Sequence, residues 1–358
     1  MRVCILGTGL SSLTLAKSLV NQKIYVDVLC SKKTFLVNKT RTIGISKSNV
    51  EFFNEKIINI KKIIYKLNKI EIYSDNLEKQ KLINFENNND HLFSIVKNYK
   101  LQEILEKKLS RSKYFRKINY KKKLNYSKDY DLVFNTDYNH PITKKHFNKK
   151  IEKKYNSVSY TTIIKHEKIS NNVAVQIFTK NGPLAFLPIS DYETSVVYSI
   201  NNSFKNETEI NNLINNYNFK YNLKKIHKID CFELKGLILR SYFHKNILAF
   251  GDLLHRIHPL AGQGFNMTIR DIKILNDIIR NKIDLGLSLD SSLNTEFENI
   301  QKHKNYIFSS GIDLIYEFFN LERKTKNDFL SKSIQHFNKN PAINKIFTKI
   351  ADKGFFLN

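Results

Sequence analysis

The first thirty residues show the alternation of apolar runs and helical spacing that a parallel sheet requires. Residues 3–6 form a short, entirely apolar run, as expected of a parallel strand that is buried on both faces. Apolar residues then recur at nearly helical spacing over 10–20, and a second apolar run follows at 24–29. This order of strand, helix and strand is a βαβ unit. We therefore predict that the chain opens with the first unit of a parallel sheet.

Periodicity also predicts elements further along the chain. Residues 155–200 hold alternating runs rich in β-branched and aromatic residues, which predicts an antiparallel sheet. Together these patterns predict an α/β fold class with a parallel sheet, a separate antiparallel sheet and C-terminal helices. The other expected elements are a helix at about 99–109, buried strands at 130–134 and 247–250, a long helix at about 264–283, and helices within 290–358.

Composition changes the picture mainly through charge. The 358 residues include 59 Lys and Arg against 33 Asp and Glu, which gives a formal net charge of +26. Lysines are spread over the whole chain and arginines are few, a pattern that favours a solvated surface over the arginine forks typical of phosphate recognition. We therefore expect no nucleic-acid partner, whereas contact with an anionic membrane surface stays open.

Cysteine usage and hydropathy predict a cytoplasmic protein. Cys4, Cys30 and Cys231 are widely spaced and form no CxxC pair, so reduced thiols are expected. No stretch approaches the roughly 18 apolar residues that a membrane span needs. Residues 1–7 lead directly into a glycine turn, without the architecture of a signal peptide. Peripheral attachment to the inner face of the cytoplasmic membrane remains compatible with this prediction.

A first glycine turn, Gly7-Thr8-Gly9-Leu10-Ser11-Ser12, follows the first strand. In dinucleotide-binding loops the first glycine permits a tight turn, and the second lets the backbone approach the pyrophosphate at the helix N-terminus. The third position is Ser12, which is small but not glycine. The carboxylate expected about 20 residues later is replaced by Cys30, and Asp27 lies inside the second strand. The motif favours a nucleotide site with altered positions.

A second glycine turn is more specific. Residues 251–266 read G-D-L-L-H-R-I-H-P-L-A-G-Q-G-F-N after a buried strand. Asp252 at a strand end can accept hydrogen bonds from sugar hydroxyls, and the glycines let backbone amides converge at a helix N-terminus. Asp271, early in that helix, is expected to support the loop. His255 and His258 have no third ligand at a suitable spacing, so we predict no metal site.

This turn resembles the GDxxHxxxPxxGxGxN motif of the class A flavoprotein monooxygenases. Its residue sequence is most similar to that of the ubiquinone-biosynthesis hydroxylases. Residues 40–46 (T-R-T-I-G-I-S), 97–105 (K-N-Y-K-L-Q-E-I-L) and 178–188 (F-T-K-N-G-P-L-A-F-L-P) resemble further segments of the same family. The resemblance implies that FAD is bound by Gly7, Gly9, Leu10, Ser12, Arg41, Gln102, Asp252, Pro259, Gly262, Gln263, Gly264, Phe265 and Asn266.

The resemblance also implies an activity. It implies hydroxylation of the aromatic ring of a polyprenylated phenol or quinol in ubiquinone biosynthesis, with NAD(P)H and O2, through a flavin C4a-hydroperoxide. No side chain identifies itself as an acid–base catalyst, and Tyr160 and Phe265 are placed near the substrate. The parts it implies are a doubly wound FAD-binding domain (1–65, 97–140 and 240–285), an inserted antiparallel β domain that binds the substrate (66–96 and 141–239) and a C-terminal helical region (286–358).

Departures from the family pattern leave alternatives open. The family's Asp-Gly pair is Asp137-Tyr138 here, so that with Ser12 and Cys30 three nucleotide markers are altered. A catalytically inactive flavin-fold subunit of a ubiquinone-biosynthesis assembly would tolerate these changes, and flavin-dependent isoprenoid reductases share the fold. Residues 329–356 mix apolar residues with lysines, which predicts either peripheral attachment to anionic membranes or packing onto the flavin domain.

Overall fold

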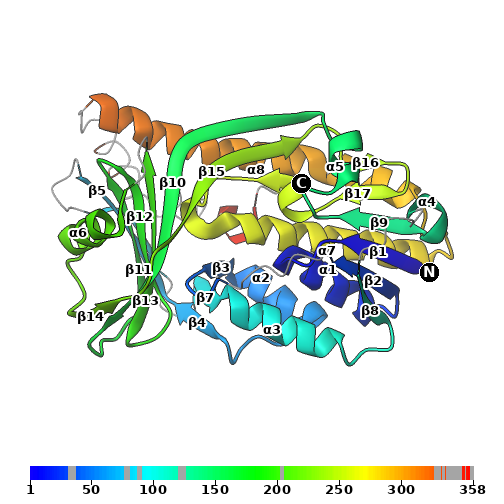
Figure 1. The fold of residues 1–358 in the computed structure, drawn as a ribbon, viewed down its shortest axis with the longest axis horizontal. Helices are drawn as coiled ribbons and strands as arrows, with labels where there is room; N and C mark the ends of the chain where they lie inside the picture. The colour runs from blue at the N-terminus through cyan, green and yellow to red at the C-terminus, as the bar shows by residue number, and fades with distance from the viewer. Residues whose placement is uncertain are drawn as a thin grey trace.

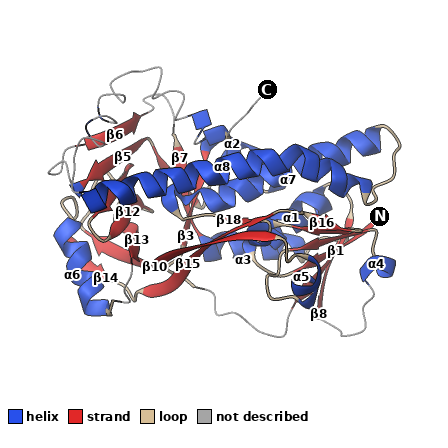
Figure 2. Cartoon of the chain, turned by 90° about the horizontal axis from the view of Figure 1, so that it is seen from above, coloured by secondary structure: helices blue, strands red, loops and turns tan. Residues whose placement is uncertain are grey.

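The computed structural model describes residues 1–30, 38–75, 81–86, 91–119, 126–201 and 205–325, together with 332, 335, 349, 350 and 352–354. Two large sheets lie toward opposite ends of the long axis, and the long strands β10 and β15 run between them (Figure 1). Helices α7 and α8 lie along the same axis (Figure 2). A cavity lined by residues of both sheets lies where they approach each other.

The first sheet is mostly parallel and has the order β16-β17-β9-β1-β2-β8. Its central strand β1 pairs in parallel with both β2 and β9. Val3, Cys4 and Ile5 in β1 are completely buried, which is why this strand reads as an unbroken apolar run. The strands are β1 (Arg2–Leu6), β2 (Tyr25–Cys30), β8 (Phe115–Asn119), β9 (Leu132–Asn135), β16 (Phe243–His244) and β17 (Ile247–Ala249).

Three helices pack together beside this sheet. Helix α1 (Leu10–Asn21) contacts both α3 (Asn98–Leu109) and α7 (Gln263–Asp284). Leu13, Leu15 and Leu19 of α1 are buried in the same core as the strands. Two short helices, α4 (Tyr126–Asp129) and α5 (Pro141–His146), flank β9. The predicted βαβ opening is therefore confirmed.

The second sheet has nine strands in the order β18-β15-β10-β13-β12-β11-β5-β6, with β14 paired to β10. Every pair is antiparallel except β11 with β5. The strands are β5 (Lys69–Ser74), β6 (Lys81–Glu86), β10 (Lys150–His166), β11 (Val173–Thr179), β12 (Gly182–Pro188), β13 (Glu193–Asn201), β14 (Leu223–Ile226), β15 (Asp230–Leu239) and β18 (His255–Arg256).

Side-chain alternation divides the two faces of this sheet. One face buries Phe186, Tyr198 and Ile164 against helix α6 (Glu207–Tyr217), whose Ile210 and Ile214 complete a separate apolar core. The other face, which carries Gln176 and Ala185, is directed into a cavity. Because successive strand residues point to opposite sides, the same strands serve both a core and a site.

A small antiparallel sheet, β3 (Thr42–Ser46), β7 (Phe93–Lys97) and β4 (Ile64–Leu67), lies between the two large ones. Strand β3 leads directly into α2 (Lys47–Phe52) and η1 (Phe53–Ile57). The amide of Ser48 donates a hydrogen bond to Oδ1 of Asp352 at 2.9 Å, and Oγ of Ser46 donates to the Asp352 carbonyl at 2.9 Å. The far C-terminal residues thus contact the start of α2.

Most predicted elements are confirmed, with boundaries displaced by one or two residues. The long helix expected at 264–283 is α7, and the C-terminal helical pattern begins with α8 (Ser292–Thr325). The stretch 329–356, predicted to bind membranes or pack on the flavin domain, lies largely outside the described residues. Among the residues that the structure describes, no helix is long and apolar enough to cross a bilayer.

Candidate functional site

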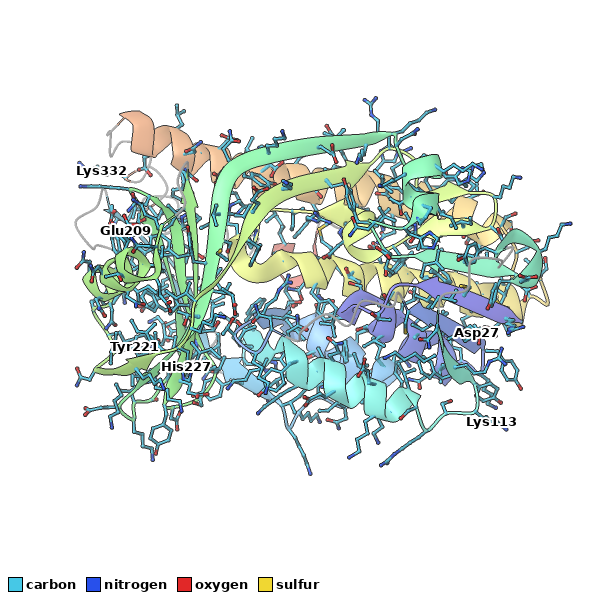
Figure 3. The ribbon with its side chains drawn as sticks, in the orientation of Figure 1. Asp27, Lys113, Glu209, Tyr221, His227 and Lys332 are labelled. Atoms are coloured by element: carbon cyan, nitrogen blue, oxygen red, sulfur yellow. The ribbon has the colours of Figure 1, made fainter. Side chains whose placement is uncertain are left out.

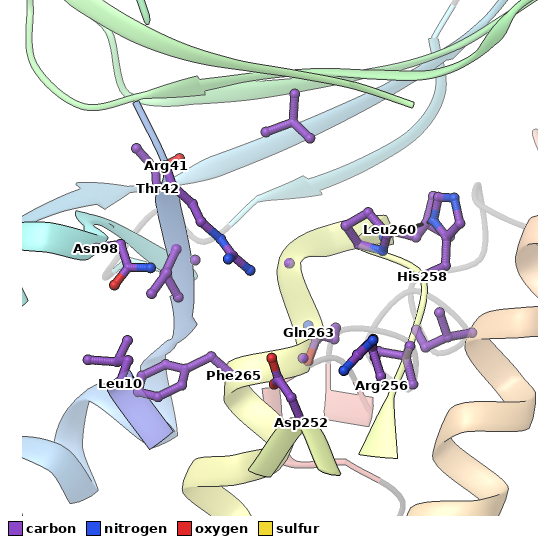
Figure 4. A pocket seen from close by; sticks show the side chains of 18 of the residues that line it. Leu10, Arg41, Thr42, Asn98, Asp252, Arg256, His258, Leu260, Gln263 and Phe265 are labelled. Carbon is purple, nitrogen blue, oxygen red and sulfur yellow. Dashed lines mark hydrogen bonds between the residues drawn. The ribbon is translucent and has the colours of Figure 1, made fainter. Parts of the chain in front are cut away.

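A single cavity of about 2550 Å³ connects the carboxyl edge of the parallel sheet with the open face of the mixed sheet. Pockets for one drug-sized ligand typically measure about 300–1,000 Å³, so this cavity has room for a large cofactor together with a substrate. Figure 4 shows Asp252 and Arg256 on one side, Leu10 and Phe265 on another, and Arg41 extending toward Gln263 from the strand side.

The β1–α1 turn forms one end of the cavity. Gly7 has φ +113°, and a Cβ there would lie 2.4 Å from Oγ1 of Thr136, so the turn requires glycine. Gly9 has open space around it, and no side chain caps α1. An uncapped helix N-terminus attracts anions through its unpaired amides. This geometry fits a bound pyrophosphate.

Ser12, the altered third position of this motif, has a structural partner. Its hydroxyl is buried and lies 2.6 Å from Oγ1 of Thr136, which itself donates to the carbonyl of Leu6 at 2.9 Å. Ser12 therefore ties α1 to the residue that follows β9. The replacement of glycine by serine adds a hydrogen bond between two sheet-edge segments and leaves the turn intact.

The end of β2 differs more from a typical dinucleotide site. Asp27 is buried and accepts hydrogen bonds from Nε of Arg2 at 2.9 Å, Nε of Arg116 at 2.9 Å and the hydroxyl of Tyr130 at 3.0 Å. Burial raises the pKa of Asp27, but these three donors outweigh burial and hold it below the usual value. Asp27 lies far from the mixed sheet (Figure 3). It is occupied within the fold and does not line the cavity.

Tyr138, which stands where the family has glycine, is held by charged neighbours. Lys150 donates a hydrogen bond to its hydroxyl at 3.0 Å, and the hydroxyl donates to Oε1 of Glu152 at 3.1 Å. The guanidinium of Arg256 lies 5.3 Å from the ring centroid, within cation–π range. Tyr138 and Arg256 both line the cavity, so this departure forms part of its wall.

The second glycine turn approaches the first. Gly251 has φ +62°, and a Cβ there would lie 2.8 Å from Cβ of Ser11. This close contact places the exposed carboxylate of Asp252 on the cavity wall near the start of α1. The turn continues through η3 (Gly251–Leu253) and η4 (Leu260–Gly262) into α7. Two helix N-termini therefore border one cavity.

Behind this turn lies a buried polar network centred on Asp271. Nε2 of His255 donates to Oδ2 of Asp271 at 2.6 Å, and both side chains are almost completely buried. Gln301 and Asn305 of α8 donate to Oδ1 at 2.7 and 3.1 Å. The prediction that Asp271 supports the loop is confirmed. Since a buried carboxylate is stable only when paired, this network fixes the loop relative to α7 and α8.

The structure brings twelve of the thirteen predicted cofactor residues to the cavity wall. The exception is Asn266, which is completely buried behind the wall. Its Oδ1 accepts hydrogen bonds from the amide of Ser46 at 3.0 Å and Nδ2 of Asn49 at 2.9 Å, and its Nδ2 donates to the Gly44 carbonyl at 3.1 Å. Asn266 joins α7 to β3 and α2, which is a positioning role.

The prediction for Tyr160 is wrong. Tyr160 points to the α6 side of the mixed sheet, and its hydroxyl accepts a hydrogen bond from the amide of Lys205 at 2.7 Å. Its neighbour Thr161 lines the cavity instead. Phe265 does line the cavity, as predicted. A shift of one residue in strand phase exchanges the two faces, and the sequence pattern did not define that phase.

The apolar end of the cavity was missed by sequence reasoning. It lies between the open face of the mixed sheet and α8, and Leu314 and Ile315 on its rim are 73% and 40% exposed. The alternation of small and apolar residues along β11 and β12 was the available signal. The lining residues in this part are Ile70, Ile72, Ile83, Phe85, Ala174, Phe178, Ala185, Phe308, Ile312, Phe318 and Phe319.

Solved structures with this architecture cover almost the whole chain. The p-nitrophenol 4-monooxygenase of Pseudomonas putida DLL-E4 superimposes with a TM-score of 0.76 at 12% identity, over 97% of this chain and 96% of that one. Klebsiella pneumoniae HpxO, solved with FAD and uric acid, gives a TM-score of 0.77 at 11% identity, over 99% and 97%. This is the fold of the FAD-dependent monooxygenases. The fold class predicted from the sequence is therefore confirmed.

Known proteins that are similar in sequence match part of this chain. The 3-demethoxyubiquinol 3-hydroxylase of Escherichia coli K12 is 30% identical over 158 residues, 40% of this chain and 39% of that protein. Human ubiquinone biosynthesis monooxygenase COQ6 is 26% identical over 205 residues, 46% and 44% of the two chains. The match thus spans less than half the length of these relatives. No family model matches the chain.

Proposed function

We propose that the chain is an FAD-dependent monooxygenase that hydroxylates the aromatic ring of a polyprenylated phenol or quinol in ubiquinone biosynthesis. The observation that carries the proposal is the single cavity, which joins two uncapped helix N-termini to an apolar sheet face. The likeness to the ubiquinone hydroxylases supports the substrate class. We include the predicted division into an FAD-binding domain, a substrate domain and a C-terminal region in this proposal.

The residues of the two glycine turns fit FAD. Gly9 and Gly264 would admit the pyrophosphate because a Cβ at either position has no neighbour within 4 Å, so the space in front of them is open. Asp252 would accept hydrogen bonds from sugar hydroxyls, and Arg41, Gln102 and Gln263 would donate to the cofactor. FAD supplies the redox chemistry when bound, with NAD(P)H as reductant and O2 as the source of oxygen.

The chain's own contribution lies in orientation and exclusion of water. The apolar wall formed by β5, β11 and α8 would take up the isoprenoid substituent and keep water from the reacting ring. Exposed Leu314 and Ile315 at the rim allow a substituent longer than the cavity to extend outward. We assign to no described side chain of the cavity wall the role of an acid or base that exchanges a proton with the ring hydroxyl.

Membrane contact forms a second part of the proposal. A polyprenylated substrate partitions into lipid, so the enzyme would approach an anionic surface through the lysine-bearing stretch 329–356. Substitution of Lys339 and Lys345 by Glu should lower liposome flotation while leaving FAD binding unchanged. Equal flotation of the variant would remove this stretch from the membrane-binding surface.

The experiment is a flavin titration followed by turnover. The purified chain should bind FAD, oxidise NAD(P)H faster with a prenylated phenol present, and release the hydroxylated ring, detected by mass spectrometry. Asp252→Ala should weaken FAD binding about tenfold or more by removing a charge-assisted hydrogen bond. Asp284→Ala, an exposed site at the end of α7, is the matched control.

Each outcome selects one alternative. Absence of bound flavin favours the catalytically inactive subunit motivated by Ser12, Cys30 and Tyr138. Reduction of isoprenoid double bonds in place of ring hydroxylation favours the flavin-dependent reductase.

A further inference from the structure

The sequence has no carboxylate at the end of β2, where dinucleotide sites usually have one. Cys30 ends β2, and the following residues 31–37 read S-K-K-T-F-L-V, without an acid. Asp27 is committed to Arg2, Arg116 and Tyr130 inside the fold. A carboxylate at this position accepts hydrogen bonds from ribose hydroxyls in such folds. If a nucleotide binds here, a carboxylate acceptor must come from another element.

Glu106 of α3 stands at this place. It lines the cavity together with Cys30, Lys117 and Asn119, and Asn119 pairs with Cys30 across β8 and β2. Glu106 interacts electrostatically with the Cys30 thiol, whose pKa is raised mainly by burial. One helical turn earlier, Gln102 points to the same cavity. Glu106 and Gln102 therefore present one face of α3 to the site.

The carboxylate of Glu106 is positioned and still accessible. Its Oε1 lies 3.5 Å from Nζ of Lys117, and the Glu106 side chain is 41% exposed. The other acids on the described cavity wall lie on different elements: Asp137 follows β9, Asp252 follows β17, Glu233 is in β15, and Asp352 caps α2. Only Glu106, among these described residues, adjoins the end of β2.

We propose that Glu106 replaces the missing strand-end carboxylate and accepts hydrogen bonds from the ribose hydroxyls of the adenosine half of FAD. This inference rests on the proposed function, because it requires a bound dinucleotide. Lys117 holds the carboxylate toward the cavity, and α3 supplies the acceptor that β2 lacks. Glu106 is thus a cofactor-positioning residue, and its effect is confined to the adenosine end.

The test compares FAD with FMN, which lacks the adenosine half. Glu106→Gln should weaken FAD binding about tenfold or more, as expected for the loss of a hydrogen bond to a charged acceptor. FMN binding should stay within twofold. Glu103→Gln on the exposed side of the same helix is the matched control and should bind both flavins like the wild type. Flavin fluorescence quenching and calorimetry measure each dissociation constant, without turnover.

A second variant separates position from charge. Cys30→Glu combined with Glu106→Gln returns a carboxylate to the strand end and should recover at least half of the loss, expressed as the logarithm of the dissociation constant. Circular dichroism and thermal unfolding confirm the fold of each variant.

Three outcomes would overturn the inference. These are FAD affinity of Glu106→Gln within twofold of the wild type, equal weakening of FAD and FMN, and absence of recovery in the double variant. If the wild-type chain itself binds no FAD, the proposed function fails. If it binds FAD and Glu106→Gln binds equally well, only this inference fails.

Discussion

The two glycine turns that border the cavity are stabilised in different ways. At the β1–α1 edge, the wall consists of a glycine turn and of side chains such as Tyr138 that are held by partly exposed charges. Behind the second glycine turn, by contrast, the side chains of His255, Asp271 and Asn266 are almost completely buried. His255 is hydrogen-bonded to Asp271, and Asn266 accepts a hydrogen bond from the amide of Ser46. The second turn is therefore stabilised by an extended network of buried hydrogen bonds, whereas the wall beside the first turn is stabilised partly by exposed charges.

The difference explains where the sequence departs from the family pattern. Ser12, Cys30 and Tyr138 all lie around the first turn, where a new side chain such as Ser12 or Tyr138 can find a partner, Thr136 or Arg256. A substitution in the buried network would leave a polar group without a partner, which is far more costly. Substitutions around the first turn are thus tolerated better than substitutions in the buried network.

The largest expected loss of stability comes from removing the centre of the buried network. Asp271→Ala leaves His255, Gln301 and Asn305 without their acceptor, and should lower the free energy of unfolding by about 3–5 kcal/mol, as for other broken buried pairs. Urea titration measures the change. Asp277→Ala, exposed on the same helix, should change stability by less than about 0.5 kcal/mol. Similar losses in both variants would contradict the bracing role.

The pH dependence of stability tests the role of the ion pairs that Asp27 makes in β2. Its pKa is lower in the folded chain than the ordinary 3.8, so its ionised form stabilises the fold above that pH. This contribution should disappear as the pH falls through the folded pKa. Asp27→Asn should lose about 1.5–3 kcal/mol at neutral pH and should show a flatter dependence of unfolding free energy below pH 4. A constant difference between wild type and variant across this range would contradict the ion-pair role.

The two glycines of the first turn should separate folding from binding. Gly7→Ala places a Cβ against Thr136 at φ +113° and should cost about 1–3 kcal/mol of stability through backbone strain. Gly9→Ala has open space and should leave stability unchanged, while weakening FAD binding by blocking the pyrophosphate. Thermal unfolding and flavin titration measure the two effects. A stability loss in Gly9→Ala would show that the turn is packed more tightly than described.

The smallest expected effect concerns Ser12. Ser12→Ala removes the hydrogen bond to Thr136 and should reduce stability by about 1 kcal/mol, with FAD affinity nearly unchanged. Ser18→Ala, which removes another buried hydroxyl of α1 bonded to Asn276 at 2.8 Å, provides the comparison. If Ser12→Ala instead abolished FAD binding, serine would be a ligand-contacting residue rather than a packing substitute.

The sequence predicted those features that depend on local pattern. The β1–α1–β2 unit was visible because residues 3–6 are uniformly apolar and are followed by glycines. The second glycine turn was visible for the same reason. The face of Tyr160 was not, because it depends on the phase of β10 relative to its neighbours. Glu106 was also missed, since only the packing of α3 beside β8 brings it to the end of β2.

The contact between Asp352 and the Ser46–Ser48 turn has a consequence for biosynthesis. These partners are 304 to 306 residues apart in the chain, and the parallel sheet likewise needs β17 (Ile247–Ala249), which pairs with β9 next to β1. At about 5–20 residues per second, the ribosome needs roughly 15–60 s to deliver Asp352 after Ser48. During this interval the contacts at the start of α2 cannot form, so this part of the cavity wall is completed only after nearly the whole chain has been synthesised.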